Sequence, residues 1–346
     1  MMEASESIAI FGGTGFIGTH IAQHFLHHKL ARKIVLLDLR PPRNESYAGV
    51  LQEGLTSGQV EFIRWDVREP IPSDTLSNHP DLIFNLAAIH REPGHATREF
   101  FETNLLGAEN VCDYSSGVGC NRIVFTSSIS PYGPADEMKD ERSLAVPDTA
   151  YGSSKLTAEK MHIGWQSANP RRKLLILRPG VVFGPGEVGN VTRLIRSVVD
   201  GYFVYAGNRL TRKAGGYVKE LGYVVQFGIE HQDRTGEAFS LFNFSSDPPP
   251  TLEEYVDVIR GIAGLRRSPL SVPRSLLLGL SYPVDILARL LGINQPISPV
   301  RVKKLFRSTS IDPAKLRALG YKWVFSTEEA FQDWKRESPK DFLKSW

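Results

Sequence analysis

The chain has 346 residues, enough for one large or two modest domains, each with its own core. Charged residues make up 23% and apolar residues 41%, as in an ordinary globular protein, and a formal charge of +3 gives no reason to expect nucleic acid as a partner. The opening residues have neither the basic nor the apolar region of a signal peptide. Cys112 and Cys120 lie in apolar patterns typical of buried thiols, so we expect a cytoplasmic protein.

The first predicted strand and helix enclose a glycine-rich turn. An apolar run over residues 8–11 is followed by Gly12, Gly15 and Gly18, and residues 19–30 have the pattern of a helix. Strand, glycine turn and helix in this order are typical of dinucleotide binding, because glycine lets the backbone approach a pyrophosphate at the helix N-terminus. The glycine spacing differs from that of the dehydrogenase fingerprint, whose first two glycines are only two residues apart.

The second predicted strand covers residues 33–37 and ends at Asp38. This carboxylate lies 20 residues after Gly18, where an acidic side chain can accept hydrogen bonds from an adenosine ribose. It would repel a 2′-phosphate, so the sequence favours NAD over NADP. Arg40 and Arg43 follow closely and are able to pair with such a phosphate, which keeps NADP as the alternative.

The next two predicted strands, residues 60–65 and 82–86, end in residues suited to the same ligand. Asp66-Val67 follows the first and is expected to contact the adenine edge. The small pair Ala87-Ala88 follows the second and lets a cofactor lie against the backbone. His90, just beyond, is expected to face the same crevice and contact the substrate.

A helical pattern over residues 100–114 contains Asn104, which we expect to tie this helix to the sheet beneath the site. A fifth strand, residues 122–126, leads into Ser127-Ser128. The Ser128 hydroxyl is able to donate a hydrogen bond to the oxygen of an alcohol or ketone. These two segments therefore supply support for the site and one candidate catalytic residue.

Tyr151 and Lys155 form the candidate catalytic pair. Residues four apart share a helix face, and an ammonium beside a phenol lowers the phenol pKa from about 10 toward the range useful for proton transfer. Tyr151 would exchange the proton of the substrate oxygen while a nicotinamide exchanges the hydride. Lys155 would also hold the nicotinamide ribose hydroxyls.

These motifs occur in the order found in a known enzyme family. The chain resembles the extended short-chain dehydrogenase/reductase superfamily, specifically the NAD-dependent epimerase/dehydratase family that acts on nucleotide sugars. The resemblance is specific over roughly residues 7–186 and looser beyond. The segments that carry it are Gly12-x-x-Gly15-x-x-Gly18, Asp38, Asp66-Val67, Asn85-Leu86-Ala87-Ala88, Asn104, Ser127-Ser128 before Tyr132-Gly133, Tyr151-x-x-x-Lys155 and residues 177–186.

The resemblance implies an α/β fold: a Rossmann-type doubly wound parallel sheet with a smaller C-terminal α/β substrate-binding lobe. Residues 1–180 would form the NAD-binding domain, with about 215–246 returning to it, and residues 181–214 and 247–346 would form the lobe. Ser128, Tyr151 and Lys155 become the catalytic set, with NAD as cofactor and no metal. The expected cofactor contacts are Gly12, Gly15, Phe16, Ile17, Gly18, Asp38, Asp66, Val67, Leu86, Ala87, Ala88, Asn104, Tyr151, Lys155, Pro179 and Val182.

The C-terminal half offers cations for a substrate diphosphate, which arginine forks suit. A sixth strand over residues 174–177 is followed by a loop over the site and a helix over residues 190–199, and residues 239–244 return to the sheet. Tyr217-Val218-Lys219-Glu220 keeps the aromatic-Val start of a family segment but lacks its acidic pair, which affects the expected sugar specificity. The expected substrate contacts are His90, Ser128, Asn190, Arg193 and Arg301, with Arg212 and Lys213 as further cationic candidates.

The apolar stretch 271–292 is interrupted by Pro283 and Asp285 and is too short and broken to span a bilayer. We interpret it as a helix pair of the smaller lobe or as a dimer or partner surface, with contact to a membrane surface as the alternative. We expect a homodimer with no transmembrane segment. Basic residues at helix spacing over 301–319 indicate a solvated face.

The function implied is a nucleotide-sugar epimerase that removes a hydride at the hexose C4 and returns it on the other face. A 4,6-dehydratase of this family would have an acidic pair after the catalytic serine, where Ile129-Ser130 stand, and a fucose-type enzyme would want a cysteine there. A dehydrogenase or reductase acting on a steroid-like or other lipophilic alcohol is one alternative. A non-catalytic NAD-binding protein is the other, disfavoured by the intact set of Ser128, Tyr151 and Lys155.

Overall fold

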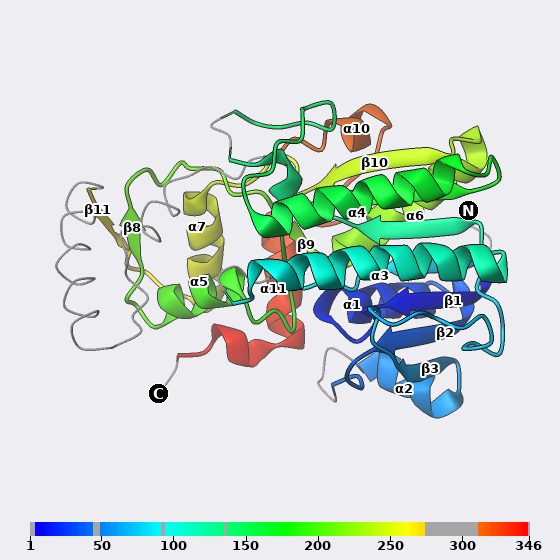
Figure 1. The fold of residues 1–346 in the computed structure, drawn as a ribbon. Coiled ribbons are helices and arrows are strands. Elements are labelled where there is room, and N and C mark those ends of the chain that lie inside the picture. The colour runs from blue at the N-terminus through cyan, green and yellow to red at the C-terminus, as the bar shows by residue number, and fades with distance from the viewer. Residues whose placement is uncertain (1–3, 44–48, 91–93, 135–136, 274–310, 345–346) are drawn as a thin grey trace.

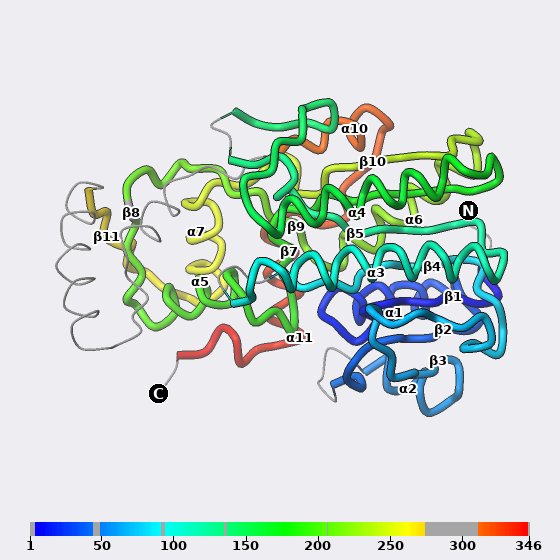
Figure 2. Tube along the Cα trace, in the orientation of Figure 1, coloured from blue at the N-terminus to red at the C-terminus, as the bar shows by residue number. Residues whose placement is uncertain are grey.

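The computed structural model describes residues 4–43, 49–90, 94–134, 137–273 and 311–344. A layered α/β body carries a smaller group of elements at the carboxyl ends of its strands (Figure 1), and the path between the two parts is easiest to follow as a tube (Figure 2). None of the described helices combines the length and hydropathy needed to cross a lipid bilayer.

The central sheet has seven strands in the order β10-β6-β5-β4-β1-β2-β3, and every pairing between them is parallel. All seven were predicted, with ends that differ by a few residues. The order reverses on either side of β1, so the sheet is doubly wound and the predicted Rossmann-type fold is confirmed. The strands are β1 (Ser5–Phe11), β2 (Ala31–Asp38), β3 (Val60–Arg64), β4 (Leu82–Asn85), β5 (Arg122–Thr126), β6 (Lys173–Pro179) and β10 (Phe239–Phe244).

Helices cover both faces of this sheet because its strands are apolar on both sides. In β1, Ile8 and Ile10 pack into the core beneath α1, α2 and α6, whereas Ala9 and Phe11 pack beneath α3 and α4. The alternation follows from the two-residue period of a strand. The helices are α1 (Phe16–His27), α2 (Gly49–Ser57), α3 (Thr97–Val118), α4 (Ala150–Ser167) and α6 (Val218–Thr235).

The smaller group of elements has a core of its own, which includes Phe183, Phe331 and Trp334. Two pairs of short parallel strands belong to it, β7 with β9 and β8 with β11. Thr251 and Glu254 make a reciprocal capping box at the start of α7. The elements are β7 (Val181–Phe183), α5 (Asn190–Val199), β8 (Val204–Ala206), β9 (Gly215–Tyr217), α7 (Leu252–Ala263), β11 (Leu270–Val272), α11 (Thr327–Glu337) and the 3₁₀ helix η3 (Pro339–Phe342).

Two segments singled out in the C-terminal half are described by the structure only in part. Of the apolar stretch 271–292, only residues 271–273 are described, and the first two of them belong to β11. Of the basic segment 301–319, the described part contains one short helix, α10 (Ala314–Ala318), whose Leu316 packs into the core of the large sheet. The remaining residues of both predictions lie outside the described part of the chain.

Both cysteines are buried free thiols, as predicted. Burial raises the pKa of Cys112 to about 12 and that of Cys120 to about 11. At neutral pH both thiols are therefore protonated and behave as small apolar side chains.

Candidate functional site

The glycine turn lies between the end of β1 and the start of α1. Gly12 has φ +76°, and a Cβ on it would lie 2.7 Å from the backbone nitrogen of Ala87, so the turn rests directly on the chain that follows β4. Gly15 is the N-cap of α1 and supplies no side-chain cap to the first turn. The N–H groups of that turn therefore remain available to an anionic ligand, as dinucleotide binding requires.

Asp38 ends β2 beside this turn. Its Oδ2 accepts a hydrogen bond from Thr14 N at 3.2 Å, and its Oδ1 accepts one from Leu39 N at 2.7 Å. A carboxylate has about four acceptor positions, so two remain for ribose hydroxyls. The strand end thus holds Asp38 in the place that the sequence predicts.

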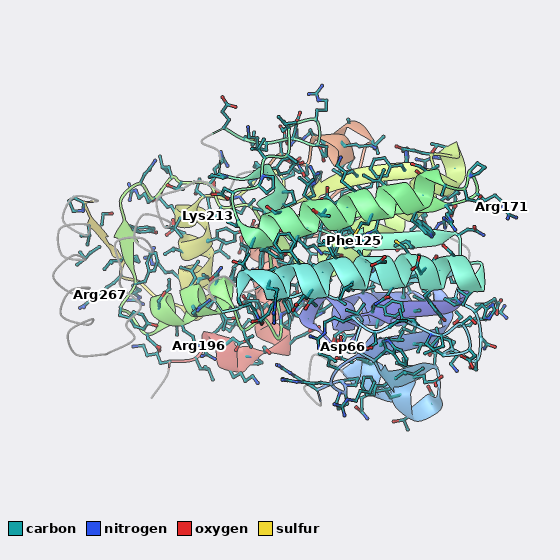
Figure 3. The ribbon with its side chains drawn as sticks, in the orientation of Figure 1. Asp66, Phe125, Arg171, Arg196, Lys213 and Arg267 are labelled. Atoms are coloured by element: carbon teal, nitrogen blue, oxygen red, sulfur yellow. The ribbon has the colours of Figure 1, made fainter. Side chains whose placement is uncertain are left out.

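The two residues predicted to contact adenine have other partners in the described structure. The Asp66 carboxylate (Figure 3) accepts hydrogen bonds from Arg68 Nε at 3.0 Å, and this partner is the main cause that lowers the Asp66 pKa. The Val67 side chain is buried against Gly107 of α3. Only their backbone and the edge of the Asp66 carboxylate are left to contact a base.

Asn104 connects the segment after β4 with α4. Its Oδ1 accepts from Ile89 N at 3.1 Å, while its Nδ2 donates to Ile89 O at 3.3 Å and to Ser154 Oγ at 2.9 Å. Both amide hydrogens are used within the protein, so Asn104 joins α3 to the segment after β4 and to α4. His90, at the end of the same segment, is exposed.

The start of α4 packs against the segment after β5, which begins with Ser128. Thr149 caps the helix by accepting from Gly152 N at 3.0 Å, and a Cβ on Gly152 would lie 2.6 Å from Ser130 O. Ser128 Oγ accepts from Ser130 N at 3.1 Å, which orients the hydroxyl. The fold therefore brings Ser128 and the first turn of the tyrosine helix to the same edge of the sheet, although they are far apart in sequence.

Tyr151 and Lys155 occupy the inner side of this first part of α4. The Tyr151 ring is half-buried and lies 6.0 Å from that of Phe100, centroid to centroid. Lys155 is 2% exposed, and its Nζ lies 4.2 Å from the centroid of the Phe125 ring, beneath α3 and α4 (Figure 3). Burial lowers the Lys155 pKa to about 7, an effect that the charge of Glu159 opposes.

The residues present fit NAD. Lys155 is nearly fully buried, and an ammonium in such surroundings needs hydrogen-bond acceptors. The nicotinamide ribose hydroxyls are acceptors of the right kind. At the other end of the sheet edge, the uncapped turn after Gly15 suits a pyrophosphate and Asp38 suits the adenosine ribose.

Pro179 and Val182, the residues expected near the nicotinamide, lie where the chain leaves the sheet. The Pro179 carbonyl accepts from Ile129 N at 3.1 Å, so this point is fixed beside the serine segment. Val182 lies in β7 and packs against the cores of both parts of the molecule. Ser128 and the expected nicotinamide contacts are therefore neighbours.

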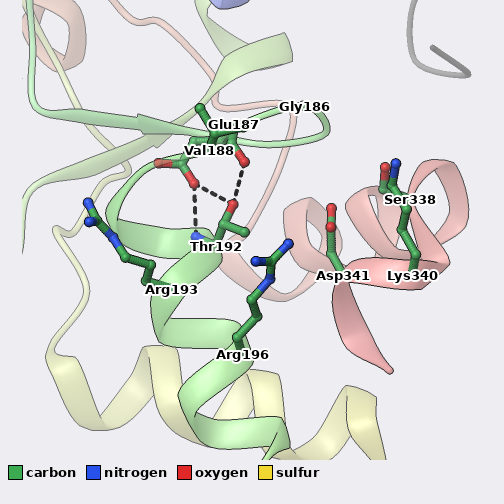
Figure 4. Close-up of a pocket in the computed structure, with 9 residues that line it drawn as sticks. All are labelled: Gly186, Glu187, Val188, Thr192, Arg193, Arg196, Ser338, Lys340 and Asp341. Atoms are coloured by element: carbon green, nitrogen blue, oxygen red, sulfur yellow. Dashed lines mark hydrogen bonds between the residues drawn. The ribbon is translucent and has the colours of Figure 1, made fainter. Parts of the chain in front are cut away.

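Asn190 and Arg193, two of the expected substrate contacts, stand together at the exposed start of α5. Arg193 Nη2 donates to Asn190 Oδ1 at 2.9 Å, and Arg193 Nε donates to Gly189 O at 3.0 Å. Arg193 also borders a pocket of about 230 Å³ between α5 and η3 (Figure 4). Its lining comprises Gly186, Glu187, Val188, Thr192, Arg193, Arg196, Ser338, Lys340 and Asp341.

The other cationic candidates have different surroundings. Arg212 Nη1 donates to Pro249 O at 2.5 Å, so that guanidinium is partly used within the smaller lobe. Burial lowers the pKa of Lys213, which lies at the end of the loop before β9. Arg301 lies outside the described residues.

Glu220 anchors the C-terminal segment to the start of α6. It is buried in the first turn of α6 and accepts hydrogen bonds from the hydroxyl of Tyr321 and from the backbone nitrogens of Val324, at 3.0 Å, and Phe325, at 2.9 Å. The segment that lacks the acidic pair of the family is therefore still held to the C-terminal part of the chain. The neighbouring Lys219 forms an ion pair instead, with its Nζ 2.6 Å from Asp333 Oδ2.

One buried group beneath the site was not predicted. Arg178 donates to Glu159 through Nε at 2.8 Å and Nη2 at 2.6 Å, which joins β6 to the tyrosine helix. The sequence held a signal for it: Lys155, Glu159 and His162 recur at helical spacing on the face of α4 that packs on the sheet. Charged residues on such a face require buried partners.

A doubly wound parallel sheet with a glycine turn after its first strand defines a Rossmann-type dinucleotide-binding protein. More narrowly, the chain belongs to the NAD-dependent epimerase/dehydratase family, whose model matches residues 8–241. This confirms the family and the NAD cofactor expected from the sequence. It supports an enzyme without deciding between epimerase and dehydratase.

Among curated relatives, an N-acetyl-alpha-D-glucosaminyl-diphospho-ditrans,octacis-undecaprenol 4-epimerase of Escherichia coli O157:H7 is 26% identical over 92% of this chain and 90% of that protein. A 3beta-hydroxysteroid-dehydrogenase/decarboxylase of Arabidopsis thaliana, isoform 1, is 25% identical over 96% of this chain and 80% of that protein. The structure of UDP-glucuronic acid 4-epimerase from Bacillus cereus in complex with NAD has TM-score 0.73 and 18% identity, covering 97% of this chain and 99% of that one. This structural likeness concerns the fold.

Proposed function

We propose that this protein is an NAD-dependent epimerase that inverts C4 of a hexose carried on a nucleoside diphosphate. The observation that carries the proposal is that the start of α4, which bears Tyr151 and Lys155, packs against the segment after Ser128, in a chain of the epimerase/dehydratase family. Sugar 4-epimerases recur among its relatives, including enzymes named for UDP-glucose. A diphosphate-linked sugar is the feature that these relatives' names share with that of the E. coli O157:H7 enzyme.

Each residue has a distinct part in the proposed reaction. Bound NAD supplies the acceptor and later the donor of the hydride. Ser128 donates a hydrogen bond to the C4 oxygen and holds it in place. Tyr151 removes the proton of that oxygen as the hydride leaves and returns it when the hydride comes back on the opposite face. Lys155 holds the ribose hydroxyls, and its charge favours the phenolate.

At the other end of the substrate, Asn190 and Arg193 would bind the diphosphate, with His90 and Arg301 as further contacts. The exposed Arg193 guanidinium at the start of α5 supports this placement. In this scheme residues 181–214 and 247–346 form the substrate-binding lobe. We also infer a cytoplasmic homodimer, which light scattering of the purified protein would test.

The test is a screen of UDP-hexoses, UDP-N-acetylhexosamines and UDP-hexuronic acids with analysis of product stereochemistry. An epimerase gives the C4 epimer with no net reduction of added NAD. Loss of water from the sugar would instead identify a dehydratase. Absence of any sugar product across the screen would contradict the proposal.

A dehydrogenase acting on a lipophilic alcohol is the second candidate, because the Arabidopsis relative matches over 96% of this chain. Its hallmark is steady accumulation of NADH with a 3β-hydroxysteroid and no product from any nucleotide sugar. The same purified protein therefore distinguishes the two candidates.

A further inference from the structure

The ion pair between Glu159 and Arg178 is almost completely removed from solvent, with side-chain exposures of 1% and 7%. Its two hydrogen bonds are parallel, so the guanidinium grips both carboxylate oxygens. Removing two charges from water is expensive, so a buried pair by itself adds little to stability. The pair lies on the helix that carries Tyr151 and Lys155 and on the strand β6 beneath it.

Arg178 also contacts the segment that follows Ser128. Its guanidinium carbon lies 4.6 Å from the centroid of the Tyr132 ring, in the 3₁₀ helix η2 (Ser130–Tyr132) that follows the catalytic serine. The Tyr132 hydroxyl donates to Asn243 Oδ1 of β10 at 2.8 Å. Arg178 also directly precedes Pro179. The guanidinium is therefore fixed between β6, η2 and β10, and it fixes Glu159 in turn.

Glu159 lies one helical turn beyond Lys155 on the buried side of α4. It is the one negative charge that acts on Lys155 within the described residues, and it opposes the burial that lowers the lysine pKa. His162 lies one turn further on. Its Nδ1 donates to Ala158 O and its Nε2 accepts from Asn85, so the ring is neutral. The titratable groups that interact electrostatically with Lys155 in the described structure are Glu159 and His162, and Tyr151 precedes it by one turn of the same helix.

We propose that Glu159 and Arg178 are positioning residues for Lys155: Arg178 fixes the Glu159 carboxylate, and that carboxylate keeps the lysine ammonium charged beside Tyr151 and the nicotinamide ribose. The catalytic consequence rests on the proposed function, whereas the effect on Lys155 and on NAD binding does not. A pair that only joined α4 to β6 would change stability and leave the titration of Lys155 as it was.

The experiment follows Lys155 by NMR of protein labelled at lysine ¹³Cε, with the resonance assigned by its loss in Lys155→Arg. In Glu159→Gln we expect the titration of Lys155 to move down by about one to two pH units, because the opposite charge is gone. NAD affinity should then fall at both pH 6 and pH 8, by the larger factor at pH 8, where less of the lysine in the variant remains charged. Asp233→Asn makes the same charge change at the Arg122 and Lys173 pairs, away from α4, and should move neither quantity.

A second variant guards against misfolding, because Glu159→Gln leaves the Arg178 charge buried without its partner. Glu159→Gln/Arg178→Met removes both charges and should fold, and the Lys155 titration should again move down, by less than in Glu159→Gln because the positive charge of Arg178 is lost as well. An unchanged titration in both folded variants overturns the proposal and makes the pair structural.

The two hypotheses fail separately. If Lys155 shifts but no nucleotide sugar is turned over by the wild type, the positioning role stands and the proposed function is wrong. If the wild type epimerises a sugar and Lys155 does not shift, the function stands and the positioning role is wrong.

Discussion

His20 Nε2 donates a hydrogen bond to the carbonyl oxygen of Pro185 at 2.9 Å, which joins the helix behind the glycine turn to the loop that follows β7. His20 is buried, and this burial lowers its pKa to about 4, so the ring is neutral at physiological pH. The contact is a direct mechanical link between the expected cofactor site and the smaller lobe.

Replacing His20 by leucine should lower the free energy of unfolding by about 1–3 kcal/mol, because it leaves the Pro185 carbonyl buried without a donor. His20→Gln keeps an N–H donor and should recover much of the loss. Urea unfolding of both variants measures the difference. Equal stability of the two would mean that packing, and not the hydrogen bond, makes the link.

Three buried histidines make stability fall in acid. The pKa values of His20, His24 and His162 are each lowered from 6.5 to about 4, chiefly by burial. As pH falls below 6.5, the unfolded chain takes up protons that the folded protein does not, so these groups reduce stability between pH 6.5 and about 4 and add no further loss below.

Each histidine contributes a slope of at most about 1.4 kcal/mol per pH unit within that window. Urea unfolding between pH 7.5 and 4.5 should show the unfolding free energy falling with pH. In His162→Asn this free energy should fall less steeply. Replacing the exposed His79 by glutamine should leave the slope unchanged. A flat profile between pH 6.5 and 5 would show that the buried rings already accept protons in the folded state.

Asp38 should set the preference for NAD. Its carboxylate is held by Thr14 N and Leu39 N at the end of β2, where it would repel a 2′-phosphate. Asp38→Asn should improve NADP binding relative to NAD by about tenfold or more, since two close negative charges cost over 1 kcal/mol. Fluorescence titration with both nucleotides measures the ratio, with Glu61→Gln as the charge control. Wild-type protein that binds NADP as tightly as NAD would mean that Arg40 or Arg43 prevails.

Glu220 should be required for the C-terminal segment to stay in place. Glu220→Ala removes the acceptor for Tyr321 and for two backbone N–H groups, so we expect a loss of about 2–4 kcal/mol of unfolding free energy. Tyr321→Phe removes one of those bonds and should lose less. Early proteolysis after residue 311 in Glu220→Ala, but not in Tyr321→Phe, would locate the effect.

The sheet could be predicted because its strands are short apolar runs that end in chemistry-bearing residues. Asp38 and Asn104 lie where their sequence positions indicated. The short strands β8 and β11 could not be predicted, since a run of three residues is too short to carry a periodic signal. Their pairing is decided by the lobe around them.

Within the site, the difficult part was the partners of charged groups. Arg68 follows Asp66 by two residues and donates a hydrogen bond to its carboxylate. The sequence pattern does not determine which local conformation the two side chains adopt. Glu159 and Arg178 are 19 residues apart on a helix and a strand, and only the packing of α4 on β6 brings them together. Patterns predict which face is buried, whereas partners depend on tertiary geometry.

Tyr151→Phe is the sharpest test of the site. The phenylalanine ring keeps its packing near Phe100, so fold and NAD binding should remain close to wild type. Without the phenol oxygen, proton transfer is lost and turnover should fall on the order of 10²- to 10⁴-fold. Lys155→Ala should differ, because the lysine serves both the ribose and the phenol: NAD affinity should fall along with turnover. Measuring kcat and the NAD dissociation constant for both variants separates the two roles, and wild-type turnover in Tyr151→Phe would make this tyrosine an ordinary helix residue.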